Sequence, residues 1–154
     1  MYPCCEQLCY TDAPDILGLR GGPLASLRRI GQQIDTRAGT IENVIEYEPA
    51  KWNPLVATLG AEQDRLQQRV LLSYEYSGNR CNLKIAGTAF RFQQILGVKL
   101  NSLQPLTLKG VLEVPFGSFE VLYNDGALRI VRTQQGYYSI NRKMDPDEGW
   151  DVAL

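Results

Sequence analysis

Short runs of alternating apolar and polar residues dominate the second half of the chain. Four of them occupy residues 108–114, 119–123, 128–132 and 137–141. β-branched and aromatic residues fill the runs, as is typical of strands. The gaps contain Gly, Asn, Asp and Pro, which suit tight turns. The pattern predicts an antiparallel meander whose first strand ends at Pro115 and Gly117.

The first half of the chain shows two further hairpins. Residues 29–35 and 40–47 flank a turn that carries Gly39, and residues 70–76 and 80–86 flank Ser77-Gly78-Asn79. A single helical turn fits 23–28, because Pro favours the first helical position. Residues 88–95 fit either a strand or a short helix. Residues 49–66, with Trp52 and Leu55, either cover one end of the molecule or continue a strand.

These elements predict an all-β protein, an antiparallel lipocalin-like β-barrel of about eight strands with one or two short helices. A barrel of eight strands is wide enough to hold one small ligand. We expect one barrel domain over residues 1–141 and an exposed, acidic C-terminal arm over residues 142–154.

Composition removes several classes of function. The 154 residues carry a formal net charge of -1, so nothing indicates a nucleic-acid partner. Histidine is absent, which excludes Ser-His-Asp and Cys-His catalysis and imidazole metal sites. No cluster of oxygen ligands predicts another metal site. The four cysteines are expected to be free thiols, and a disulfide between the N-terminal cluster and Cys81 is the alternative. Because every apolar run is too short to cross a bilayer, any membrane contact would be peripheral.

Two separated motifs carry a resemblance to a known family. They contain Tyr10, Thr11, Ile34, Asp35, Gly39, Glu42, Asn43 and Val44 in the first, and Tyr123, Asp125, Leu128, Arg129, Ile130, Arg132 and Gly136 in the second. Their order and spacing resemble those of the plastid-lipid-associated proteins, the PAP/fibrillin family. The family's Trp falls on Glu6 here, and its preceding helix has no counterpart. We therefore expect the N-terminal part of the family domain to be missing or divergent.

The resemblance implies a non-catalytic protein in plastids, at thylakoids or lipid globules (plastoglobules), although no transit peptide is visible. It implies binding or sequestration of apolar molecules such as carotenoids, prenylquinones or fatty acids, with no required cofactor. The alternative is a scaffold subunit that docks on a thylakoid protein complex or a prenylquinone-synthesis enzyme. A lipid-processing enzyme that uses Glu113, Glu120 or Tyr123 is the rival class.

Candidate ligand contacts are aromatic residues that would line the barrel interior, together with one arginine. They are Tyr74, Tyr76, Phe90, Phe92, Phe119, Tyr123 and Arg129. Core packing is the competing interpretation for each aromatic residue. Arg129 and Arg132 lie three apart on a strand and should face opposite sides, one structural and one solvated. Asp35 and Asp125 are expected to hydrogen-bond the backbone of their turns.

The N-terminal residues 4–10 are predicted to add to the sheet as a short strand, because an incomplete barrel leaves an open edge. Leu8 and Tyr10 would face one side of this strand, and Gln7 and Cys9 the other. The alternative is that residues 1–10 form a disordered remnant.

Overall fold

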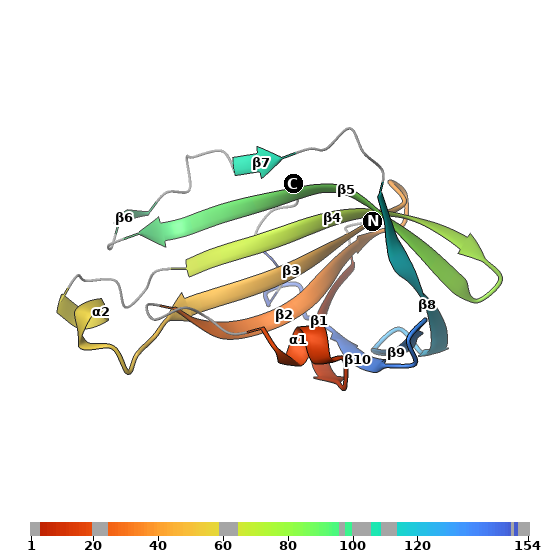
Figure 1. The fold of residues 1–154 in the computed structure, drawn as a ribbon, viewed down its shortest axis with the longest axis horizontal. Helices are drawn as coiled ribbons and strands as arrows, with labels where there is room; N and C mark the ends of the chain where they lie inside the picture. Colours follow the sequence, from red (N-terminus) through yellow and green to blue (C-terminus); the bar gives the residue numbers. More distant parts are fainter. Residues whose placement is uncertain are drawn as a thin grey trace.

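The computed structural model describes residues 4–19, 25–58, 65–95, 98–99, 106–108, 114–148 and 150. They form ten strands and two short helices (Figure 1). The elements are β1 (Cys4–Thr11), α1 (Pro14–Leu17), β2 (Ala25–Asp35), β3 (Thr40–Pro49), α2 (Pro54–Thr58), β4 (Arg65–Ser77), β5 (Arg80–Ile95), β6 (Val98–Lys99), β7 (Leu106–Leu108), β8 (Val114–Asn124), β9 (Leu128–Thr133) and β10 (Tyr138–Lys143).

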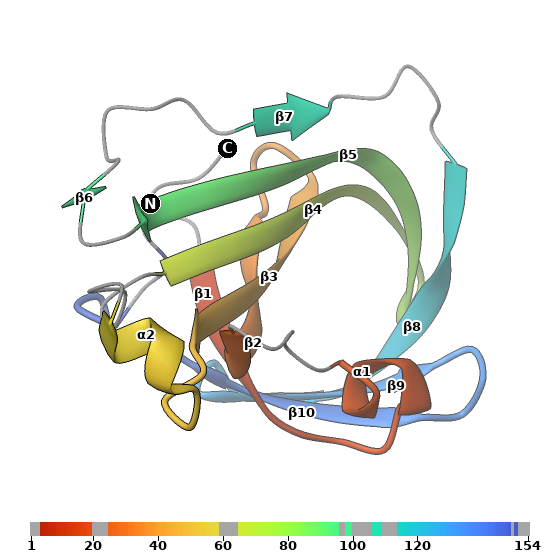
Figure 2. The ribbon, with the colours of Figure 1, turned by 60° about the vertical axis from the view of Figure 1, so that its left-hand side comes forward.

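Eight of these strands close into a ring. The order is β4-β3-β2-β1-β10-β9-β8-β5, and β5 pairs back with β4. Every neighbouring pair is antiparallel. Figure 2 shows the sheet curling from β5 and β4 through β8 to β10. The predicted all-β, barrel-like fold is confirmed.

The ring is closed over only part of its length. β1 pairs with β2 through Cys4–Gln7, opposite Gly31–Ile34, and β8 pairs with β5 only along Arg80–Ile85. Beyond these points β2 to β5 continue as a sheet of four strands that extends to the left in Figure 1, and the short strands β6 and β7 pair with its β5 edge. We call residues 25–30, 44–49, 65–71 and 86–95 the open half. The rest of the ring is the closed half.

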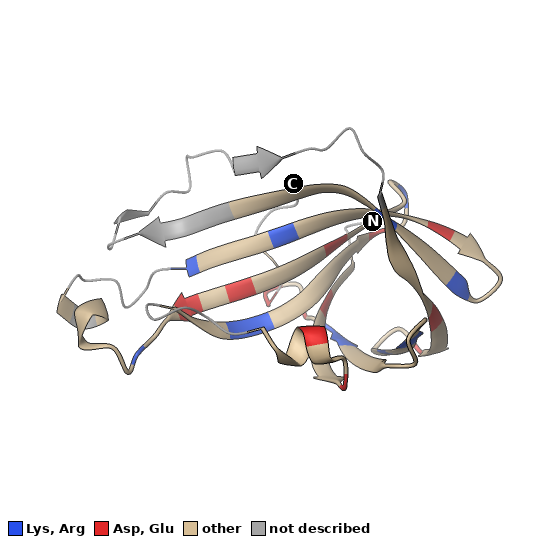
Figure 3. Ribbon diagram, in the orientation of Figure 1, with Lys and Arg blue, Asp and Glu red and all other residues tan. Residues whose placement is uncertain are grey.

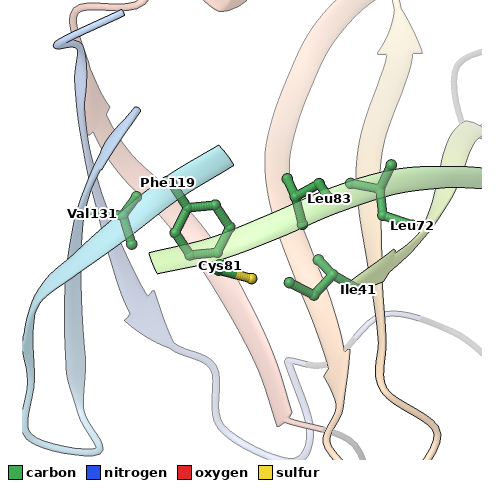
Figure 4. Packing of buried hydrophobic residues seen from close by; sticks show 6 residues of the cluster. All are labelled: Ile41, Leu72, Cys81, Leu83, Phe119 and Val131. Carbon is green, nitrogen blue, oxygen red and sulfur yellow. The ribbon is translucent and has the colours of Figure 1, made fainter. Parts of the chain in front are cut away.

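An apolar cluster fills the interior of the closed half. It consists of Ile41, Leu72, Cys81, Leu83, Phe119 and Val131 (Figure 4). These side chains come from β3, β4, β5, β8 and β9, so the cluster joins both sides of the ring. Burial raises the pKa of the Cys81 thiol to about 11, so this group stays protonated and packs as a small apolar side chain.

The strand predicted to end at Pro115 and Gly117 instead continues through them. Both lie inside β8, where Phe116 is the extra residue of a β-bulge between two pairs with β5. Gly117 has φ +132, a conformation that glycine adopts easily. Pro and Gly mark bulges as well as turns, which explains the error. Most of the predicted strand 108–114 lies outside the described residues.

Two segments for which a helix was considered form strands: the helical turn expected at residues 23–28 is wrong, and the strand alternative for residues 88–95 is confirmed. β2 begins at Ala25, so residues 25–27 are paired with β3, and Arg28 lies at a register shift within the strand rather than in a helix. Residues 88–95 continue β5 and pair with β4. In both cases the hydrogen bonds to a neighbouring strand outweigh a weak local helical preference. The turn between β2 and β3 is as predicted, with Gly39 at φ +66.

The N-terminal strand is confirmed, with one change of face. β1 lies between β2 and β10. A bulge between Leu8 and Tyr10 shifts the register, so Leu8 lies opposite Asn141 and Tyr10 opposite Ile140. These partners are neighbours on β10 and face opposite sides of the sheet. Leu8 and Tyr10 therefore do not share a face, contrary to the prediction.

The C-terminal arm packs against the outer face of the sheet instead of being wholly exposed. Met144 and Trp150 are buried with Val44 on β3. The Arg29 guanidinium lies 4.3 Å from the centre of the Trp150 ring. Gly31 permits this contact, because a Cβ atom there would stand 2.5 Å from the ring.

Candidate functional site

The aromatic residues predicted to line one interior are divided between different parts of the molecule. Phe119 belongs to the closed-half cluster, and Tyr74 packs against that cluster. Tyr76 and Tyr123 lie on the surface, 58% and 48% exposed. Phe90 lies in the open half, and the side chain of Phe92 is outside the described part of the chain. The described members of this set are therefore spread over a buried cluster, the open half and the exposed surface.

Arg129 is held by buried partners inside the closed half. Its guanidinium forms a 2.6 Å salt bridge with Glu6 and a hydrogen bond with Gln32. It also lies over the Phe119 ring, 5.6 Å from the ring centre. Arg132 points to the opposite, exposed side and pairs with Glu120 at 2.7 Å. The geometry favours a structural role for Arg129, joining β9 to β1 and β2.

The two aspartates of the family motifs bind the backbone of their turns. Asp35 accepts hydrogen bonds from the N–H groups of Arg37 and Ala38, at 2.8 and 3.0 Å. Asp125 does the same for Leu128 and Ala127, at 2.7 and 2.9 Å. These N–H groups hold the pKa of both carboxyls below its ordinary value. The predicted turn role is confirmed.

Other motif residues also contact the protein itself. Thr11 donates from Oγ1 to the carbonyl oxygen of Tyr138 at 2.9 Å, and Asn43 accepts from Gln32 at 2.7 Å. Gly136 has φ +93 in the turn between β9 and β10. Tyr10 is exposed on the surface, 54% accessible. Thr11, Asn43 and Gly136 therefore have structural roles in the ring.

Several apolar side chains lie on the inner face of the open half. Ile45 and Tyr47 are each an even number of positions along β3 from the core residue Ile41, so they face the interior as Ile41 does. Ile30 and Leu27 on β2 pair with Ile45 and Tyr47, and Leu66 on β4 pairs with Tyr47, whereas Gln68 on β4 lies between Ile45 and Phe90 of β5. We define the apolar strip as Leu27, Ile30, Ile45, Tyr47, Leu66 and Phe90. Five of its members are half-buried and Phe90 is 36% exposed.

The outer face of the same strands is polar and more deeply buried. The polar network comprises Arg28, Arg29, Glu42, Glu46, Gln67 and Arg69. Arg69 pairs with Glu42 at 2.7 Å, and Glu46 accepts from Gln67 at 2.9 Å and pairs with both Arg28 and Arg29. Figure 3 shows the basic residues of β2 and β4 on either side of the acidic residues of β3.

Burial raises the pKa of Glu46, but hydrogen bonds from Gln67 and Arg29 outweigh it and leave the pKa below its ordinary value. The Glu46 side chain is therefore an ion at neutral pH although only 1% of it is exposed. Sequence reasoning missed this network. The signal in the sequence was the spacing of these polar residues. Glu42 and Glu46 fall on one face of one strand, and Gln67 and Arg69 fall on one face of the next.

A polar surface pocket of about 220 Å³ lies at the outer rim of β8 and β9. It is lined by Arg80, Ser118, Phe119, Glu120, Arg132, Thr133, Gln134 and Gly136. The guanidinium groups of Arg132 and Arg80 both pair with Glu120, at 2.7 and 3.5 Å respectively. The hydrogen bond from Arg132 lowers the pKa of the Glu120 carboxyl. Such a lining suits water or a small polar molecule better than an apolar ligand.

Metal binding and membrane crossing are two further properties to consider for the described residues. No group of three or more Cys, Asp or Glu side chains there is placed to hold a metal ion. No helix among them has the length and apolar character needed to cross a membrane.

Comparison with known proteins gives one clear relationship. The family model PAP_fibrillin matches residues 7–141, which is most of the chain. A search of curated proteins gave no match. The matched region contains both motifs and all eight strands of the ring, apart from the first residues of β1 and the last of β10. The chain belongs to the PAP/fibrillin family of plastid lipid-associated proteins.

Proposed function

We propose that this protein binds an apolar molecule of the carotenoid, prenylquinone or fatty-acid class against the apolar strip, without catalysis, at thylakoids or lipid globules. The proposal rests on the apolar strip. Its six side chains lie on four adjacent strands, and each of these side chains remains half-buried or exposed. Apolar side chains that gather at a water-accessible surface with polar neighbours are typical of ligand-binding sites. The family is plastid-associated and linked to lipids, which supports this class of ligand.

The test is a titration of the purified protein in solution with a fluorescent fatty-acid analogue, and with β-carotene and a prenylquinone as competitors. Phe90→Ser and Leu66→Ser each remove apolar contact from the strip and should weaken binding at least about fivefold, equivalent to about 1 kcal/mol. Phe116→Ser is the matched control, because Phe116 is exposed on the β8 bulge. Wild-type protein that binds none of the three ligands, or strip variants that bind as wild type does, would reject the proposal.

The second candidate is a scaffold for a thylakoid protein complex or a prenylquinone-synthesis enzyme. The filled interior of the closed half favours it, because side chains already occupy the space expected of a container. Native protein isolated from plastids separates the two. Co-purifying pigment, quinone or fatty acid supports the binding function, whereas a stoichiometric protein partner and no apolar molecule supports the scaffold.

A further inference from the structure

The most exposed large apolar side chain of the described residues is Trp52, at 71%. It precedes α2, and Leu55 in that helix is 55% exposed. Val56 is buried and fixes the helix to the body of the protein. Lys51 lies beside Trp52 with 78% of its side chain exposed. We call residues 51–55 the tip.

We propose that the tip anchors the protein on a lipid surface, so that an apolar ligand passes between that surface and the apolar strip. This inference rests on the proposed function, because it names the source of the ligand. Tryptophan and lysine suit a membrane interface: the indole ring partitions among the headgroups, and the lysine keeps its ammonium group in water.

The size of the tip argues against a protein partner. Two exposed apolar side chains fall far short of the roughly 800 Å² that each partner buries in a standard protein interface. Insertion into a lipid surface has no such threshold, since each side chain that enters the apolar phase contributes separately.

The position of the tip connects it to the strip. β3 carries Tyr47 of the strip, ends at Pro49 and leads directly to Trp52, while Leu66 lies opposite Tyr47 on β4. The row of the strip formed by Leu27, Tyr47 and Leu66 is therefore the one nearest the tip. In Figures 1 and 2 α2 projects from this end of the four-stranded sheet.

Fluorescence tests the anchor, because the chain has two tryptophans and Trp150 is buried. Vesicles of phosphatidylcholine with about one fifth phosphatidylglycerol, brominated along the acyl chains, should quench the emission of Trp52 and leave that of Trp150. Trp52→Phe should abolish the quenching. Trp52→Ser combined with Leu55→Ser should reduce the bound fraction in flotation at least about tenfold. Tyr76→Ser, which alters an exposed aromatic residue in the hairpin at the other end of β4, should leave it unchanged.

Three results would overturn the anchor: no binding of wild-type protein to these vesicles, full binding of the double variant, or a dimer in sedimentation that the double variant converts to monomer. The third would make the tip a contact between two copies of the chain. The fatty-acid titration without vesicles is measured on the same double variant. If the double variant still binds the fatty-acid analogue but no longer floats with vesicles, the anchor is supported. If the wild-type protein fails to bind the fatty-acid analogue, the proposed function is rejected on separate grounds.

Discussion

The closed and open halves of the ring differ in where they bury apolar and charged side chains. In the closed half the inner face carries the buried apolar cluster, and Arg132 and Glu120 on the outer face are open to solvent. In the open half the outer face carries buried ions, and Arg69 is fully buried. Its inner face carries the half-buried apolar strip. The difference shows that one set of continuous strands can be stabilised by packing at one end and can present an apolar surface at the other.

The polar network helps to hold the strands of the open half together from their outer face. Burying ions has a desolvation cost, which their mutual attraction and hydrogen bonds must offset. Here each buried ion has at least one hydrogen-bonded partner on an adjacent strand. The network therefore joins β2, β3 and β4 from outside.

The largest effect is expected from Arg129→Met in the closed half. It leaves the buried Glu6 carboxylate without its ionic partner, which should lower the free energy of unfolding by about 3–5 kcal/mol. Arg132→Met, three residues along the same strand on the exposed side, should cost at most about 1 kcal/mol. Urea denaturation measures both. A double change of Glu6 and Arg129 to Met should recover most of the loss, and equal costs for the two arginines would contradict the burial argument.

A direct comparison of the two halves uses apolar truncation. Leu72→Ala removes a fully buried side chain of the closed half and should cost about 3 kcal/mol, because a cavity remains. Ile45→Ala in the strip should cost about 1 kcal/mol, since that side chain is only half-buried. Both values come from denaturation curves in the absence of ligand. Equal losses would show that the strip is packed as tightly as the core.

The difference between the halves also explains what the sequence could predict. Turn chemistry at Gly39 and Asp125, and the opposite faces of Arg129 and Arg132, follow from local rules and were predicted correctly. The bulge at Phe116 and the burial of Trp150 were not, because they depend on which strands become neighbours. Alternation alone cannot say which face is buried, so the polar network and the strip required the structure.

Gly31 lies where β1 separates from β2, at the boundary of the two halves. Gly31→Ala places a Cβ atom 2.0 Å from the Glu6 carbonyl oxygen, and so forces β1 away from β2. A loss of about 1–3 kcal/mol is expected from this overpacking. Amide hydrogen exchange should show faster exchange at residues 4–7 and unchanged protection in the middle of β4. Uniformly faster exchange in both strands would mean that the two halves unfold as one unit.

Glu46→Gln tests whether the polar network stabilises the open half. The change keeps the shape of the side chain but removes its charge, and it should cost about 1–2 kcal/mol at pH 7 because Arg28 and Arg29 retain partial contact with water.

The folded protein lowers the pKa of Glu46 from its ordinary value of 4.5. The contribution of this carboxylate is therefore fully present above pH 4.5 and is lost as the pH falls through the lowered pKa of the folded state. Denaturation curves of wild type and variant should separate at neutral pH and converge in acid. Glu48→Gln is the control, because Glu48 makes only 3.8 and 3.9 Å contacts with Lys51 and Arg28, and it should change stability by less than about 0.5 kcal/mol. A constant difference between wild type and Glu46→Gln across this pH range would show that the lost stability comes from packing rather than from the charge.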